Sequence, residues 1–333
     1  MKKLIAAAVA SSMTAFAMAD ISITGDAKYE YDLTDNNGAK STRANTEAHI
    51  NFTGKSGDTT FVANFQLVER GTETAGGAAA GKEASVDGDF DMEDTYISTK
   101  VAGIGIKAGN YASSTSGLAG GIEEGGRSHG KVMMSYKLGD ISLYAGNGGT
   151  ASSGADGGMD NNMFAGASTT VGGQTIQIKK NNEALDSFGI KGSVGGVNYR
   201  YETQDSDANG DASYAEVSTT MNGVTIQYAS LDADAATMLS ETDSAVFAIE
   251  SGGISTSDGQ DQIAVSTTVD GNKITVKSGT VEKGISSSVD KDYTQLSVSR
   301  ALASGATAVI TYTDQDMDSG DKQNLEIELN VKF

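Results

Sequence analysis

The last segment of the chain constrains the fold more than any other feature. Residues 325–333 read Leu-Glu-Ile-Glu-Leu-Asn-Val-Lys-Phe, so apolar and polar side chains alternate without a break up to Phe333. A period of two places the apolar side chains on one face of a β-strand and the charged ones on the other. Lipid on the apolar face and water on the charged face would suit such a strand. The pattern therefore predicts a membrane-spanning β-strand.

Residues 1–19 have the pattern of a secretory signal peptide. Lys2 and Lys3 precede a small, apolar stretch, and Ala17-Met18-Ala19 is an A-x-A cleavage site. The stretch is shorter than the roughly 20 residues that a transmembrane helix needs. We therefore expect export with cleavage after Ala19, and one domain over residues 20–333.

Composition further limits the kinds of protein and binding partner that fit this chain. The chain has no cysteine, which excludes disulfides and thiolate metal sites. It also has no proline, as expected of a chain made mostly of ladder-paired strands. Without residues 1–19, which hold Lys2 and Lys3 but no acid, 22 basic and 44 acidic residues remain, a net charge of −22. Such a charge argues against a nucleic-acid partner and favours cations.

Alternation with a period of two recurs along residues 20–333, first over residues 21–33, 44–54 and 59–70. Short turn signals alternate with long polar connections, and residues 34–42 are expected to be the first long connection. Eight tight turns make eight hairpins, and the first and last strands bring the total to 18. The turns lie at residues 55–58, 102–103, 139–140, 172–173, 195–196, 222–223, 270–272 and 303–305.

These observations predict an all-β fold: a closed antiparallel transmembrane β-barrel of 16–18 strands, 18 by direct count. Short periplasmic turns and long extracellular loops would connect the strands. No apolar run after residue 19 approaches the length of a transmembrane helix, and only helices and closed barrels satisfy every backbone group in lipid. A secreted β-sandwich or β-helix also alternates, so a soluble all-β fold stays open as the alternative.

Three segments together resemble general diffusion porins of Gram-negative bacteria, of the alphaproteobacterial type. They are residues 21–27 (ISITGDA), residues 94–109 around the turn Ala102-Gly103, and residues 325–333. The resemblance implies a homotrimer of barrels, usually with 16 strands, in the outer membrane beside lipopolysaccharide. It also implies that the barrel-assembly machinery reads the last strand with Phe333.

The resemblance implies a pore constriction as well. In these porins the third long loop folds into the lumen, and here it would span residues 111–130, with Glu123 and Glu124 as its acids. Basic side chains on the wall would face them and create a field across the waist, where charges act strongly because little water intervenes. The wall candidates on inward phase are Arg43, Arg70, Lys100 and Lys107.

One segment has the spacing of a calcium loop. Asp205, Asp207, Asn209 and Asp211, followed by Glu216, match the pattern D-x-[DN]-x-[DN]-G-x5-E. Strands are expected to flank it instead of helices, so a solvated hairpin loop is the alternative. We expect no other cofactor, with Ca²⁺ or Mg²⁺ at the acidic loops as the one candidate.

Catalysis has little support, because the only histidines are His49 and His129 and neither has a nucleophile at a defined spacing. We therefore expect no enzyme. The sequence predicts an outer-membrane channel, cation-preferring and water-filled, for passive diffusion of small hydrophilic solutes and ions. The alternative is a non-conducting structural or adhesive β-protein whose acidic loops bind divalent cations.

Overall fold

The computed structural model describes most of the expected barrel domain, in ten ranges. They are residues 20–74, 87–112, 127–147, 163–181, 185–206, 210–233, 259–282, 290–303, 305–316 and 320–333. No helix within these ranges is long and apolar enough to cross a membrane. The expected signal peptide, residues 1–19, lies outside them.

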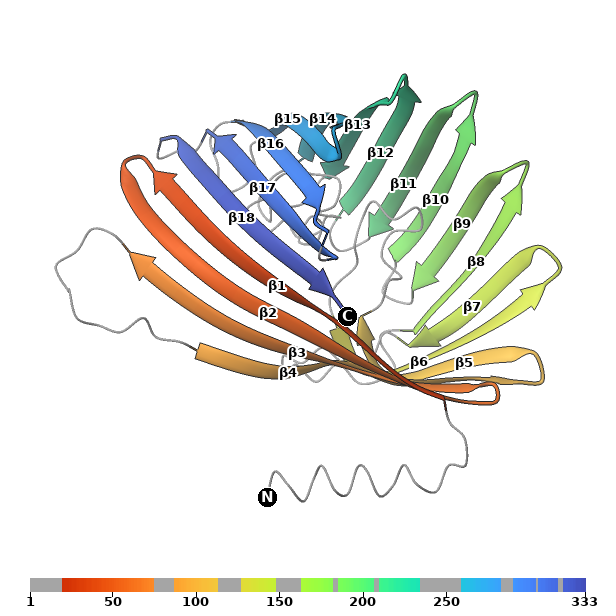
Figure 1. Cartoon of the computed structure of the whole chain (residues 1–333). Helices are drawn as coiled ribbons and strands as arrows, with labels where there is room; N and C mark the ends of the chain where they lie inside the picture. Colours follow the sequence, from red (N-terminus) through yellow and green to blue (C-terminus); the bar gives the residue numbers. More distant parts are fainter. Residues whose placement is uncertain are drawn as a thin grey trace, which may run out of the picture.

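Within these ranges, eighteen antiparallel strands form one sheet that closes on itself, each paired with its neighbours in chain order (Figure 1). This confirms the predicted fold and the direct count of 18, against the 16 strands usual in the family it resembles. The strands are β1 (Asp20–Asn36), β2 (Ala39–Ser56), β3 (Thr59–Thr74), β4 (Asp87–Val101), β5 (Ile104–Ala112), β6 (Arg127–Leu138), β7 (Ile141–Asn147), β8 (Met163–Val171), β9 (Gln174–Asn181), β10 (Leu185–Val194), β11 (Val197–Ser206), β12 (Gly210–Met221), β13 (Val224–Ala233), β14 (Gly259–Val269), β15 (Asn272–Val281), β16 (Lys291–Ala301), β17 (Ala306–Gln315) and β18 (Lys322–Lys332).

The alternation of side chains gives the sheet two different faces. Ile327 and Leu329 of β18 are 43% and 41% exposed and share the outward phase with the other large apolar side chains. Glu326 and Glu328 alternate with them and point to the inside of the barrel. An apolar outer face and a charged inner face are the arrangement that a barrel in lipid requires.

Pairing between β1 and β18 closes the barrel. The register runs from Asn36 opposite Lys322 to Asp26 opposite Lys332. Phe333 extends it by one more pair, because its amide nitrogen donates to the Gly25 carbonyl at 2.9 Å and its carbonyl accepts from the Gly25 nitrogen at 2.8 Å. Closure leaves no free edge whose backbone groups would face lipid.

Gly25 is required at this closing position by steric contact. A Cβ atom built there would lie 2.4 Å from the His49 carbonyl oxygen and 2.6 Å from Cζ of the Phe333 ring. The ring therefore lies over the glycine on the outer face, and Gly25 is buried. An aromatic ring that covers a glycine on a neighbouring strand protects backbone that a side chain would otherwise shield.

One predicted loop is wrong. Residues 34–42 were expected to form a long connection, but β1 continues to Asn36 and β2 starts at Ala39 around the two-residue turn Asn37-Gly38. Both turn residues have positive φ, 51° and 87°, as a type I′ hairpin turn needs. Asp35 stabilises the turn by accepting a hydrogen bond from the Gly38 nitrogen at 2.8 Å. The segment was misread because both faces of a strand can be polar beyond the membrane.

The wall differs in height around the barrel. Strands β1 and β2 have 17 and 18 residues, whereas β9 and β10 have 8 and 10. Figure 1 shows β1, β2 and β3 as long ribbons along one side of the barrel. The shortest described strands lie in the run β7 to β10, with 7, 9, 8 and 10 residues, six to nine strands away from β1 around the sheet.

We expect Gly25→Ala to destabilise the barrel by about 1–3 kcal/mol, because the new methyl group overlaps backbone and the Phe333 ring. The matched control is Gly54→Ala on β2, where a Cβ would meet nothing within 4 Å. That control should leave stability unchanged or raise it slightly, since alanine restricts the unfolded chain. The measurement is the urea midpoint of unfolding in detergent, followed by circular dichroism. Equal midpoints for the two variants would contradict the packing role of Gly25.

Candidate functional site

The inner wall of the barrel is the candidate functional site, and its polar side chains fall into three groups. We call them the acidic sector, on β18, β1 and β2; the lysine–aromatic sector, on β4, β5 and β6; and the hydroxyl pocket, on β13 to β16. Each group arises because alternate residues of neighbouring strands are brought side by side on one face.

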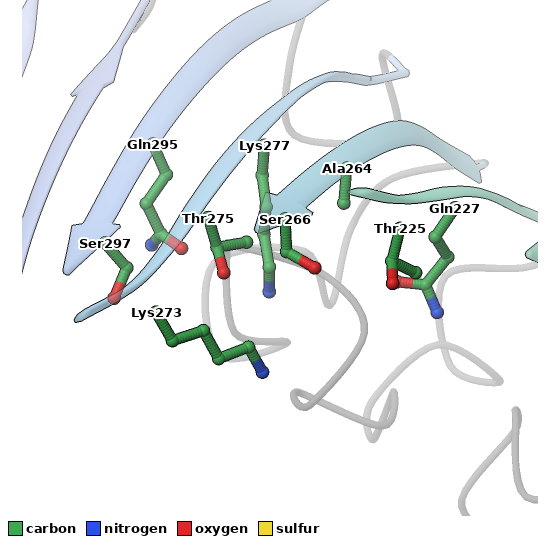
Figure 2. Close-up of a pocket in the computed structure, with 9 residues that line it drawn as sticks. All are labelled: Thr225, Gln227, Ala264, Ser266, Lys273, Thr275, Lys277, Gln295 and Ser297. Atoms are coloured by element: carbon green, nitrogen blue, oxygen red, sulfur yellow. The ribbon is translucent and has the colours of Figure 1, made fainter. Parts of the chain in front are cut away.

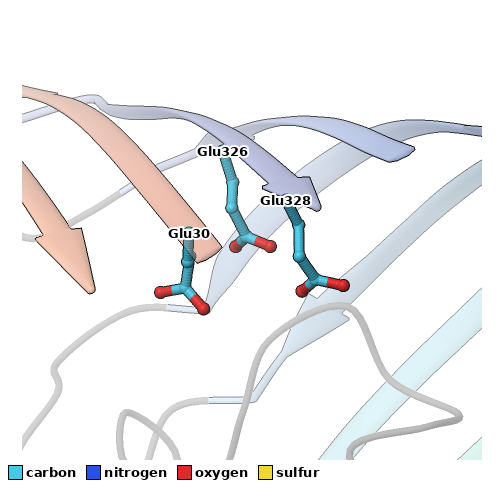
Figure 3. A group of neighbouring side chains, drawn as sticks. All are labelled: Glu30, Glu326 and Glu328. Atoms are coloured by element: carbon cyan, nitrogen blue, oxygen red, sulfur yellow. The ribbon is translucent and has the colours of Figure 1, made fainter. Parts of the chain in front are cut away.

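Three carboxylates form the centre of the acidic sector. Glu30 of β1 lies directly opposite Glu328 of β18, and Glu326 is the next inward residue along β18. One oxygen from each carboxylate lies within 4.8 Å of the others (Figure 3). Like charges on directly opposed positions repel each other, so this wall carries a concentrated negative potential.

Basic groups offset part of that potential. Lys28 places its Nζ 3.0 Å from Glu30 and 3.6 Å from Glu47. His49 has its Nδ1 3.1 Å from Asp26 and its Nε2 3.0 Å from Glu47. Because each ring nitrogen of His49 already faces a carboxylate, neither is left to activate a nucleophile. This geometry gives no support to catalysis by His49.

The lysine–aromatic sector has the opposite charge. Lys107 lies 3.9 Å from the ring centroids of both Tyr96 and Tyr111. Lys131 lies 5.4 Å from the Tyr111 ring and is only 2% exposed. Ring faces attract ammonium groups, which stabilises these charges on the wall. The lumen is therefore acidic on one side and basic on another.

The hydroxyl pocket is a hollow of about 270 Å³ in the inner wall of β13 to β16 (Figure 2). Its lining consists of hydroxyl, amide and ammonium groups and one alanine, and includes no carboxylate. The lining residues are Thr225, Gln227, Ala264, Ser266, Lys273, Thr275, Lys277, Gln295 and Ser297.

A network of hydrogen bonds adjoins the pocket. Arg200 of β11 donates from Nε to Glu216 at 2.5 Å and from Nη2 to the Tyr214 hydroxyl at 3.1 Å. The Tyr214 hydroxyl donates to Glu216 at 2.8 Å, and Gln227 donates to the other Glu216 oxygen at 2.8 Å. Glu216 thus has an arginine and two neutral donors around it, which fixes its position on the wall.

The predicted waist is only partly described. Glu123 and Glu124 lie outside the described residues, and of Arg70 only the backbone, in β3, is described. The other wall candidates do not form one group. Arg43 lies in the acidic sector, where it donates to Asn45 at 3.1 Å, while Lys107 lies three strands away. Lys100 is exposed at the end of β4 beside the turn.

The calcium-like segment divides into separate parts. Asp205 and Asp211 face each other across β11 and β12, and residues 207–209, which include Asp207 and Asn209, lie outside the described ranges. Glu216 lies five residues further along β12, about 16 Å away at the usual rise of a strand. It points inward, whereas Asp211 alternates to the outward phase. Glu216 therefore lies apart from the Asp205–Asp211 pair along the strand.

Sequence reasoning missed two features of the wall. Glu326 and Glu328 were visible on the polar face of the last strand, but their closeness to Glu30 depends on closure between β1 and β18. An even strand count implies that closure, so the pairing of the first strand with the last could have been predicted. The inward position of Lys131 could have been predicted from the alternation along β6, because Met134 and Tyr136 lie on the opposite phase and are both exposed on the outer face.

Comparisons with known proteins agree with this architecture. No family model matches the chain, and no curated protein matches it in sequence. Among solved structures, OpdQ of Pseudomonas aeruginosa matches with a TM-score of 0.64 and 10% identity, over 95% of this chain and 99% of that chain. OccK2 (OpdF) of the same organism matches with a TM-score of 0.63 and 12% identity, over 94% and 98%, and is also solved in complex with glucuronate. OprB of Pseudomonas putida matches with a TM-score of 0.57 and 10% identity, over 94% and 92%. At such identities the likeness shows the fold, over nearly the whole of both chains.

We expect Glu216→Ala to lower the free energy of unfolding by about 2–3 kcal/mol, because it leaves the largely buried Arg200 guanidinium without its carboxylate. Asp186→Ala is the control. It breaks the Lys180–Asp186 pair at 2.9 Å, whose side chains are 71% and 57% exposed, and should cost about 0.5 kcal/mol or less. Urea midpoints of the two variants test the difference, and a smaller loss for Glu216→Ala than for Asp186→Ala would refute it.

Proposed function

We propose that this protein is an outer-membrane porin, a water-filled channel through which small hydrophilic solutes and ions diffuse passively. The observation that supports this most directly is the closed 18-stranded barrel with apolar side chains outside and charged side chains inside. Barrels of 16–18 strands are wide enough to leave an aqueous channel, whereas barrels of about eight are filled by their own side chains.

The comparisons support the same function. Solved proteins of this fold include one that holds glucuronate, a small and hydrophilic acid. The setting follows from the proposed function: the outer membrane of a Gram-negative bacterium, in contact with lipopolysaccharide. A homotrimer, and recognition of the last strand with Phe333 by the barrel-assembly machinery, complete the proposal. Asp205 and Asp211, at the ends of adjacent strands, are where weak Ca²⁺ or Mg²⁺ binding would start.

We also propose a modest cation preference. The net charge of −22 after removal of residues 1–19 and the carboxylates of the acidic sector favour cations in the lumen. Lys107 and Lys131 act in the opposite direction on another part of the wall. Segregated charges give cations and anions separate paths, and the acidic sector is the path for cations.

The test of the function is single-channel recording of the purified, detergent-folded protein in a planar bilayer under a KCl gradient. We expect stepwise insertions, conductance in groups of three, and a reversal potential on the cation-selective side. Verified insertion without any current would contradict the proposed channel function and favour a structural or adhesive role for the barrel.

The acidic sector is tested by the triple variant Glu30→Gln, Glu326→Gln, Glu328→Gln. It should move the reversal potential toward anion selectivity, because it removes negative charge beside the ion path. The control is Asp35→Asn, Asp292→Asn, Asp314→Asn, which removes the same charge from residues that face outward. Equal shifts from the inner and outer triple variants would argue against a cation path along the acidic sector.

The predicted constriction is tested by the double variant Glu123→Gln with Glu124→Gln. If those acids line a constriction, this variant should also move the reversal potential toward anion selectivity.

A further inference from the structure

The hydroxyl pocket on β13 to β16 differs from the rest of the wall in the kinds of group that it presents. Hydroxyls from Thr225, Ser266, Thr275 and Ser297 alternate around it with the amides of Gln227 and Gln295. Many small donors and acceptors in one hollow suit a ligand that is itself covered with hydroxyl groups. Its volume of about 270 Å³ is close to the lower end of the about 300–1,000 Å³ typical of small-molecule sites.

The two amides are held in fixed orientations by residues outside the pocket. The Gln227 amide nitrogen donates to Glu216 at 2.8 Å, and the Gln295 amide nitrogen donates to Thr313 at 3.1 Å. Tethering each amide by its nitrogen directs its carbonyl oxygen away from that partner. At Gln227 a ligand hydroxyl can then donate to an acceptor that is already positioned, which reduces the entropy lost on binding.

Two lysines add positive charge to the same hollow. Lys273 and Lys277 lie four residues apart on β15, about 13 Å between Cα atoms, with Thr275 between them on the same face. Both side chains belong to the lining of the hollow (Figure 2).

We infer that this pocket is a binding subsite for phosphorylated polyols such as sugar phosphates. Two ammonium groups match the charge of a phosphate monoester, and lysine binds phosphate as a point charge with three rotatable donors. The hydroxyl and amide lining would bind the carbon skeleton. The inference rests on the proposed channel function, because the ligand must reach the pocket through the lumen.

The experiment measures how solutes interrupt the ion current of the wild-type channel in a planar bilayer. Ion current is recorded first, and its absence would count against the channel itself and not against the subsite. Glucose 6-phosphate, glucose and inorganic phosphate are then added separately to either side. We expect glucose 6-phosphate to interrupt the current at a lower concentration than either of the others. Block by inorganic phosphate as strong as that by glucose 6-phosphate would refute the polyol part, and equal block by glucose would refute the phosphate part.

Variants assign the effect to the pocket. Lys273→Gln with Lys277→Gln should raise the half-blocking concentration of glucose 6-phosphate roughly tenfold, as expected for the loss of two exposed ion pairs. Lys137→Gln with Lys191→Gln is the control, because it removes the same charge from inward-facing positions outside the pocket. Thr275→Val should raise the half-blocking concentration of glucose 6-phosphate about two- to fivefold and leave that of inorganic phosphate unchanged. If the two lysine pairs have equal effects, the block reflects the general charge of the lumen and the subsite is refuted.

Discussion

Closure of the sheet between β1 and β18 is the interaction on which the rest of the structure depends. It joins the two ends of the described chain, satisfies the backbone groups of both strands, and leaves no edge open to lipid. It also creates the acidic sector, because Glu30 meets Glu328 only across this junction. The position of Gly25 under the Phe333 ring shows how closely packed the junction is. Stability and charge distribution therefore have a common origin.

Much of this fold could be predicted from the sequence, because the two faces of each strand meet different surroundings. Alternation over residues 325–333 and the spacing of the turns were enough to predict a closed barrel of 18 strands. The same reasoning failed at residues 34–42, where polar side chains occupy both faces and the alternation disappears. There the dipeptide Asn37-Gly38 was the better signal, because it is itself a hairpin turn.

The candidate site was less predictable, because it depends on which strands become neighbours. The inward phase of Lys107 followed from alternation, but its place between Tyr96 and Tyr111 needed the pairing of β4 with β5. The neighbours of Glu216 were out of reach of sequence reasoning for a similar reason. A pattern of spacing suggested a loop ligand, whereas strand pairing placed it opposite Arg200. Linear motifs are weak guides where neighbouring strands supply the partners.

The unequal height of the wall has a consequence for how solutes arrive. A strand of about 9–11 residues crosses a membrane, and β1 with 17 is well beyond that length, whereas the described part of β9 has 8. As far as the described strands define it, the mouth is cut obliquely and faces sideways. In the proposed channel, a solute that arrives from the side of the β1–β2 hairpin would meet the back of that hairpin first.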